Sequence, residues 1–138
     1  MSYSEVVAGL KARYLTLSDI KVVLDGEPTA VQDSPLIYTV LDSFKRAYKG
    51  TVVEMRYRLM SRLCIRWQYP EQSEATLISL VNAIPLAIDA DWRLSGAARG
   101  ASVQTGDAGW VSIGGIEYRT LDFYIEVLEV GALESGAV

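Results

Sequence analysis

The sequence predicts an α+β fold, in which two helices pack on one face of a mainly antiparallel sheet with a long β-hairpin arm. Residues 53–67 alternate between apolar and charged side chains, and a period of two is typical of a strand with one solvated face. Apolar residues recur at helical spacing in residues 4–15 and again after Pro70. The pair Gly114-Gly115 stands between two apolar runs and predicts a tight hairpin.

One domain accounts for this length. The chain has 138 residues, half of them hydrophobic, which is enough for one core without disulfides. We expect an α+β domain over residues 1–130 and a flexible tail over residues 131–138, where small residues follow no pattern. No secretory leader is visible, and no apolar run reaches the roughly 20 residues of a membrane span. These features predict a protein that is made in the cytoplasm and makes no membrane contact.

The composition argues against most catalytic chemistry. The chain has no histidine, which removes the commonest general base and metal ligand. Its one cysteine, Cys64, lies in a strand pattern typical of a buried residue. Asp89 and Asp91 are carboxylates, but they follow a helix and fit a solvated helix end. We therefore predict no catalytic, cofactor-binding or metal-ligating residue, no cofactor, and a protein that is not an enzyme.

The N-terminal segment predicts a helix and then a short strand. Ser2 and Glu5 have the spacing of a capping box for a helix over residues 4–15. Residues 20–24 form a short extended piece before the turn-forming residues 25–28. The expected buried helix face carries Val6, Val7, Leu10 and Tyr14.

Residues 36–67 predict the arm. The segment 36–48 reads as a strand, and Lys49-Gly50 supplies a turn because glycine accepts a positive φ. The following strand, residues 53–67, spans roughly 50 Å at about 3.3 Å per residue, far more than a usual strand. Such a strand either bends at a bulge or projects beyond the domain, where the hairpin can grip a neighbouring subunit.

A second helix begins at Pro70, where proline is tolerated, and a glycine-rich loop extends to Gly100. We expect a kink or a break near Pro85, because proline cannot donate the helical hydrogen bond. The expected apolar stripe is Leu77, Val81, Ile84 and Ile88.

The C-terminal part predicts a short strand over residues 101–105, then the segment 106–109 (GDAG), and then a hairpin formed by residues 110–113 and 116–130. Its apolar residues change parity after Tyr118. That change predicts a bulge near Arg119-Thr120. The residues expected to share one face near the turn are Val111, Ile113, Ile116 and Tyr118.

Charged residues give the clearest candidates for an interface. Residues 1–70 carry ten Lys/Arg and seven Asp/Glu, a net charge of +3, whereas residues 71–138 carry three and ten, a net charge of −7. A subunit with one basic and one acidic side suits head-to-tail contact with copies of itself. The alternative interpretation is chance, with both sets on solvated faces.

The even positions of the long strand carry an arginine row, Arg56, Arg58, Arg62 and Arg66. Contact with an acidic protein surface is the interpretation we favour. The alternatives are a solvated face whose charges prevent aggregation and a nucleic-acid surface, against which the isoelectric point near 4.8 weighs. Of the tryptophans, Trp92 follows two acids in a loop and is the best candidate for an interface anchor. The full set of candidate interface residues is Lys49, Gly50, Arg56, Arg58, Arg62, Arg66, Asp89, Asp91, Trp92, Arg93 and Arg99.

The order of several segments resembles the tail terminators, or tail-completion proteins, of long-tailed siphophages and related phage-like particles. The resemblance covers roughly residues 36–130 and is carried by residues 62–68 (RLCIRWQ), 82–94 (NAIPLAIDADWRL), 106–110 (GDAGW), 113–119 (IGGIEYR) and 121–123 (LDF). It implies an α/β subunit of a virion that forms a homo-hexameric ring. Such a ring caps the tail tube protein, stops its polymerisation and joins the head–tail connector, while genomic DNA passes through the lumen without sequence-specific binding.

Two other hypotheses remain open. The first is another neck or head-completion protein, such as an adaptor or stopper, which binds filled heads instead of tube ends. The second is a small bacterial binding module or a carboxylate enzyme, which a deep pocket with two close acids would favour. An open sheet with a protruding hairpin would count against the second hypothesis.

Overall fold

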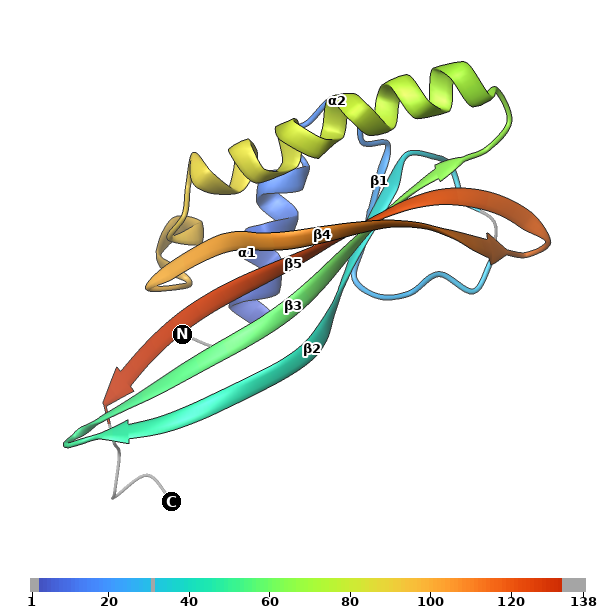
Figure 1. The fold of residues 1–138 in the computed structure, drawn as a ribbon. Helices are drawn as coiled ribbons and strands as arrows, with labels where there is room; N and C mark the ends of the chain where they lie inside the picture. The colour runs from blue at the N-terminus through green and yellow to red at the C-terminus, as the bar shows by residue number, and fades with distance from the viewer. Residues whose placement is uncertain (1–2, 31, 133–138) are drawn as a thin grey trace.

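The computed structural model describes residues 3–30 and 32–132, which form five strands, two α-helices and one short 3-10 turn. The sheet order is β1-β2-β3-β5-β4, with β1 parallel to β2 and every other pair antiparallel. Figure 1 shows both α-helices on the same side of this sheet, which confirms the predicted α+β class. The elements are α1 (Tyr3–Tyr14), β1 (Val22–Leu24), β2 (Leu36–Lys49), β3 (Val52–Arg66), α2 (Pro70–Asp89), the 3-10 turn (Leu94–Gly96), β4 (Gly100–Ile113) and β5 (Ile116–Ala132).

The main core lies between the two helices and the sheet. Val6, Leu10 and Tyr14 of α1 are buried there as predicted, because the spacing of three and four residues places them on one side of the helix. Ser2, the predicted capping residue, lies outside the described residues. We call this side of the sheet the helix-covered face. It also buries the strand residues Ile37, Leu59, Leu63, Ile65, Leu121, Phe123, Ile125 and Val127.

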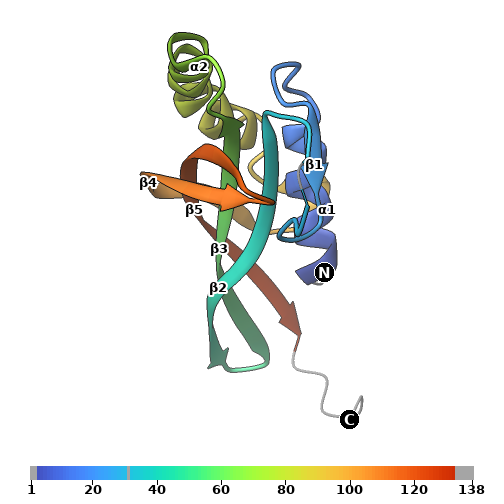
Figure 2. The same ribbon diagram turned by 90° about the vertical axis from the view of Figure 1, so that its right-hand side faces the viewer.

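A second, smaller core lies on the opposite side of the sheet, the open face. Figure 2 shows the end of the β4–β5 hairpin crossing the start of β2 and the end of β3, and this curl brings together Leu36, Tyr38, Cys64, Ile113 and Tyr118. The Tyr118 hydroxyl also donates a hydrogen bond to the Gln32 carbonyl at 3.2 Å. One end of the sheet is therefore buried on both faces.

This second core explains the parity change in β5, and the predicted bulge near Arg119-Thr120 is wrong. Tyr118 is buried on the open face and Leu121 on the helix-covered face, so the strand keeps its alternation while the buried side changes. The β3–β5 register runs without a break from Tyr118 to Ala132. Register shifts occur instead at Asp42 in β2 and at Gln104 in β4.

The prediction of two separate strands, over residues 101–105 and 110–113, is also wrong, because β4 is one continuous strand that includes residues 106–109. Gly106 approaches β5 so closely that a Cβ atom there would lie 3.0 Å from the Asp122 carbonyl oxygen. The glycines thus serve close strand packing instead of chain reversal. The turn at Gly114-Gly115 is confirmed, with φ of 57° and 81° at these two residues.

Helix α2 begins at Pro70 as predicted, but it continues through Pro85 to Asp89 without a break. Packing explains this, because Ile84, Ala87 and Ile88 around the proline are all buried and hold that turn in place. The buried stripe differs from the predicted one in Val81, which is 40% exposed, whereas Leu80 is buried.

The predicted arm is present and contains one more strand than expected. It consists of residues 41–59, which turn at Gly50 (φ 65°), together with residues 125–132 of β5. This part of β5 pairs with residues 52–59 of β3. Beyond Val40 every residue of β2 is exposed. Both views show the tip of this arm extending past the N-terminal end of α1 (Figures 1 and 2).

Candidate interaction surfaces

The arginine row of β3 lies on the open face, and its members on the arm have intramolecular partners. Arg56 forms ion pairs with Glu54 at 3.0 Å and Glu126 at 3.4 Å. Arg58 pairs with Asp42 at 3.3 Å and lies over the ring of Tyr124. The structure thus brings these two arginines together on the arm, in a network in which much of their charge is balanced locally.

Arg62 holds the middle of the sheet together. Its guanidinium donates two hydrogen bonds to the Asp122 carboxylate, at 2.7 and 3.0 Å, in a bidentate pair across the β3–β5 ladder. These hydrogen bonds raise the pKa of Arg62 above its ordinary value, so it remains charged. Next to it, burial raises the pKa of the Cys64 thiol to about 12, which leaves this cysteine protonated at neutral pH.

The remaining candidates of the hairpin lie far from the Arg62–Asp122 pair, at the two ends of β3. Lys49 and Gly50 are at the tip of the arm, where the Lys49 ammonium forms an ion pair with Glu54 at 3.1 Å. Arg66 is exposed at the opposite end of β3. The four arginines therefore do not form one continuous basic strip.

The segment after α2 forms a compact corner. The Asp91 carboxylate accepts hydrogen bonds from the Ser95 backbone N–H at 2.9 Å and from its hydroxyl at 3.0 Å. Arg93 stacks on Trp92, whose indole is 48% exposed, and the Arg99 backbone N–H donates to the Leu128 carbonyl. This corner presents an aromatic ring and a cation side by side to the solvent.

A shallow hollow of about 540 Å³ joins this corner to the arm. Asp89 and Trp92 line it together with Arg56 and Glu126, so the fold unites two groups of candidates that are distant in the sequence. Arg56 already pairs with Glu126 here. The hollow thus offers the solvent an acidic residue, Asp89, and an exposed indole, which suits contact with a basic and apolar segment.

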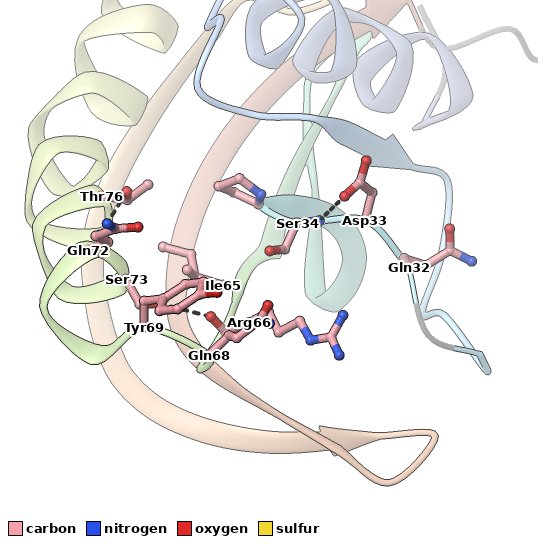
Figure 3. Close-up of a pocket in the computed structure, with 11 residues that line it drawn as sticks. Gln32, Asp33, Ser34, Ile65, Arg66, Gln68, Tyr69, Gln72, Ser73 and Thr76 are labelled. Carbon is pink, nitrogen blue, oxygen red and sulfur yellow. Dashed lines mark hydrogen bonds between the residues drawn. The ribbon is translucent and has the colours of Figure 1, made fainter.

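A second hollow, of about 560 Å³, lies between the start of α2 and the loop before β2 (Figure 3). Amides and hydroxyls dominate its lining, and the Ser73 hydroxyl donates to the Arg66 carbonyl at 2.9 Å. Asp33 and Arg66 are the charged residues of this lining among the described residues. Their opposite charges do not form the two-carboxylate arrangement that acid–base catalysis on a sugar requires.

The outer side of α2 carries an apolar surface that was not predicted from the sequence. Ile78 is 61% exposed and Leu86 is 65% exposed, and Val81 lies between them. The signal was available, because residues 75–88 contain no charged side chain and a helix that is apolar all round is normally buried on all sides.

The arm carries a second exposed apolar group. Phe44 is 59% exposed and Tyr48 is 65% exposed, and both lie on the helix-covered face, because their partners Tyr57 and Val53 point to that side. Burial and the neighbouring Glu129 carboxylate raise the pKa of Tyr57, the partner of Phe44, to about 12. The arm thus places a half-buried tyrosine on β3 beside an exposed phenylalanine on β2.

No family model matches this chain, and no curated protein matches it either. Among the described residues, no helix is long and apolar enough to cross a membrane. The same part of the chain contains no cluster of three or more residues suited to hold a metal ion.

Proposed function

We propose that this protein is a structural virion subunit, the tail terminator of a siphophage or of a related phage-like particle. The arm carries this proposal. Its β2 strand leaves Phe44 and Tyr48 exposed beyond the helices. Exposed aromatic side chains that lie close together commonly mark a surface that binds a partner.

Two further features support a subunit that meets different neighbours on its two sides. The exposed apolar patches of the arm and of α2 belong to separate parts of the molecule, as Figure 1 shows for these two elements. The charge differs as well, since the exposed part of β2 carries Lys45, Arg46 and Lys49, whereas Asp89 and Asp91 lie at and just after the end of α2. Unlike surfaces that meet head to tail generate rings when the rotation closes.

In this proposal copies of the chain form a hexameric ring on the end of the tail tube. One side of the ring binds the last turn of the tube protein, and the other side binds the head–tail connector and accepts no further tube subunit. Acidic side chains toward the lumen let DNA pass, because like charges repel and no phosphate is bound. The proposal includes no enzymatic step and no cofactor.

Electron microscopy with purified tail tubes tests the proposal. Negative staining of the protein alone and mass photometry at several concentrations report whether rings with a central hole form. Added tubes then show whether the protein sits at one end and stops tube growth. Binding to filled heads instead of tube ends would assign it to a neck or head-completion protein. A monomer that ignores both tubes and heads would contradict any role in the virion neck.

A further inference from the structure

The sheet has two open edges. β1 pairs with Leu36, Ile37 and Tyr38 only, so the outer edge of β2 is free over residues 39–49. On the other side, β4 is the last strand of the sheet, and no described strand pairs with its outer edge. The Ala101 N–H on that edge donates to the Trp92 carbonyl at 2.7 Å, so the edge is open from Ser102 onward. Each edge presents backbone N–H and C=O groups that can pair with another chain.

The two open edges are compatible in direction. β2, β3, β5 and β4 alternate in direction across the sheet, so β2 and β4 run antiparallel to each other. A second copy placed beside the first in the same orientation therefore sets its β4 antiparallel to the free part of β2. The sheet then continues from copy to copy with its antiparallel pattern unbroken.

The edge of β4 lacks the usual protection against such pairing. Edge strands commonly carry lysine or proline that blocks a further strand. β4 contains neither, and Asp107 is its one charged residue. The register shift at Gln104 is the single irregularity along its length. Open edges of this kind aggregate unless a specific partner covers them.

The apolar side chains near both edges lie on the same face of the sheet, the helix-covered face. An open groove of about 440 Å³ runs between α2 and β4 on the helix-covered face, where Val81, Pro85 and Phe123 line it. Leu41 and Phe44 project from β2 to the same face, since they pair with Leu59 and Tyr57. In a continued sheet Leu41 stands at the level of Val103, which lines the groove, and Phe44 stands at the level of Ala101, beyond the end of the groove.

The charges agree with this arrangement. Lys45 pairs with Arg56, Arg56 with Leu128, and Leu128 with Gly100, so Lys45 stands at the level where β4 begins. The start of β4 lies beside the C-terminal end of α2, which has no basic residue in its last turn. Asp89 and Asp91 follow there, and the helix dipole adds partial negative charge. In the last turn of α2, the Ala87 carbonyl already accepts a hydrogen bond from the Arg13 side chain.

From these five features we infer that the partner of the α2–β4 groove is the arm of a second copy of this chain. The free edge of β2 pairs with β4 of the neighbour, Leu41 enters the groove, Phe44 covers its end, and Lys45 and Arg46 lie on either side of the strand near Asp89 and Asp91. The contact is heterologous, so repetition generates a ring when the rotation closes. This inference rests on the proposed function only in requiring that copies of the chain assemble.

Single-cysteine crosslinking tests this contact in the full-length protein. Leu41→Cys and Val81→Cys place thiols on the arm and in the groove, while the native Cys64 is fully buried and does not react. Assembled samples of each variant alone, and of the two mixed, are treated with a short bismaleimide. The expected result is a covalent dimer in the mixture only. The wild type and a mixture of Leu15→Cys with Val81→Cys, in which Leu15 is exposed on another part of the surface, are the controls.

The outcomes separate the two proposals. No crosslink in the mixture, although the wild type forms rings, overturns the arm-in-groove contact and leaves the proposed function standing. Crosslinking of either variant with itself indicates a two-fold contact and also overturns it. A crosslink only in the mixture, in assemblies that never bind tail tubes, supports the contact and contradicts the terminator role. Failure of the wild type to assemble under any condition, tubes included, overturns both.

Discussion

At the residue scale, the buried Ser61 hydroxyl joins three elements. It lies 2.6 Å from the Tyr14 hydroxyl of α1 and 2.8 Å from the Thr39 hydroxyl of β2. All three side chains are buried, so water cannot replace a lost partner. This network fixes α1 at one height on the sheet, which an apolar contact alone does not do.

Ser61→Ala is therefore expected to lower the free energy of unfolding by about 1–3 kcal/mol, because it leaves two buried hydroxyls without their shared partner. Urea unfolding followed by circular dichroism measures this change. Ser43→Ala on the exposed part of β2 is the matched control and should change stability by less than about 0.5 kcal/mol. Equal effects of the two substitutions would contradict the role of the network.

The buried Cys64 thiol and Tyr14 hydroxyl predict that the protein loses stability at alkaline pH. Burial raises the pKa of Cys64 from its ordinary 9.0 to about 12, and it raises the pKa of Tyr14 above 10.0. The unfolded chain releases these protons at lower pH than the folded protein does. The corresponding stability is complete below about pH 9 and is lost as the pH rises toward about 12.

Thermal unfolding at a series of pH values from about 7 to 11 measures this decline. Cys64→Ala removes one of the titrating groups, so its stability should fall less steeply above about pH 9 than that of the wild type. The slope is the relevant readout, since the smaller side chain lowers stability at every pH. A wild-type stability that stays constant up to pH 11 would refute this prediction.

At the scale of elements, α2 and β4 show tertiary packing overriding local preference. Pro85 lacks the N–H that would bond to the preceding turn, yet α2 remains a helix because Ile84 and Ile88 are fully buried around it. In β4, glycines that favour turns lie in an extended strand, because Gly106 meets the β5 backbone closely. In both elements the stabilising contacts come from distant parts of the chain.

Pro85→Ala is expected to raise the free energy of unfolding by about 1–3 kcal/mol, because it restores a helical donor in a turn that is already formed. The control is Ser79→Ala, an exposed position on the same helix, which should change stability by a few tenths of a kcal/mol. Urea unfolding again gives the values. A loss of stability in Pro85→Ala would show that the proline ring has an essential packing role.

At the scale of the whole molecule, the arm and the α2–β4 groove define two unlike surfaces on one sheet. The arm offers Lys45 and Arg46, which have no ion pair among the described residues, and the groove ends at acidic residues and the C-terminus of α2. The charges that are paired within the chain, such as Arg56 and Arg58, contribute less to assembly. The two free cations are the better targets.

The double substitution Lys45→Glu and Arg46→Glu should weaken self-assembly by about tenfold or more, because it places like charges opposite Asp89 and Asp91. Light scattering over a range of protein concentrations measures the effect, and circular dichroism checks the fold. Arg66→Glu, an exposed arginine at the other end of β3, is the control and should assemble normally. Equal losses in both variants would indicate a general charge effect instead of a specific contact.

The amino-acid sequence by itself determined the elements whose signal is local. The alternation in residues 53–67 predicted β3, glycine at positions 114 and 115 predicted the hairpin turn, and proline at position 70 predicted the start of α2. These predictions succeeded because side-chain periodicity and backbone freedom depend on near neighbours. The candidate interface residues on the arm and after α2 remain predictions, and the ion pairs that several of them form within the chain were not predicted.

Only the tertiary structure decided which faces and edges are covered. The sheet curls so that Tyr118 and Leu121 are both buried on opposite sides, and β5 inserts between β3 and β4, which leaves β4 and the arm at the edges. The ion pairs of Arg56, Arg58 and Arg62 follow from the same strand order. Strand order and the curl of the sheet depend on contacts between residues that are distant in the sequence. A periodic pattern indicates that one face of a strand is buried, but it does not indicate which element covers that face.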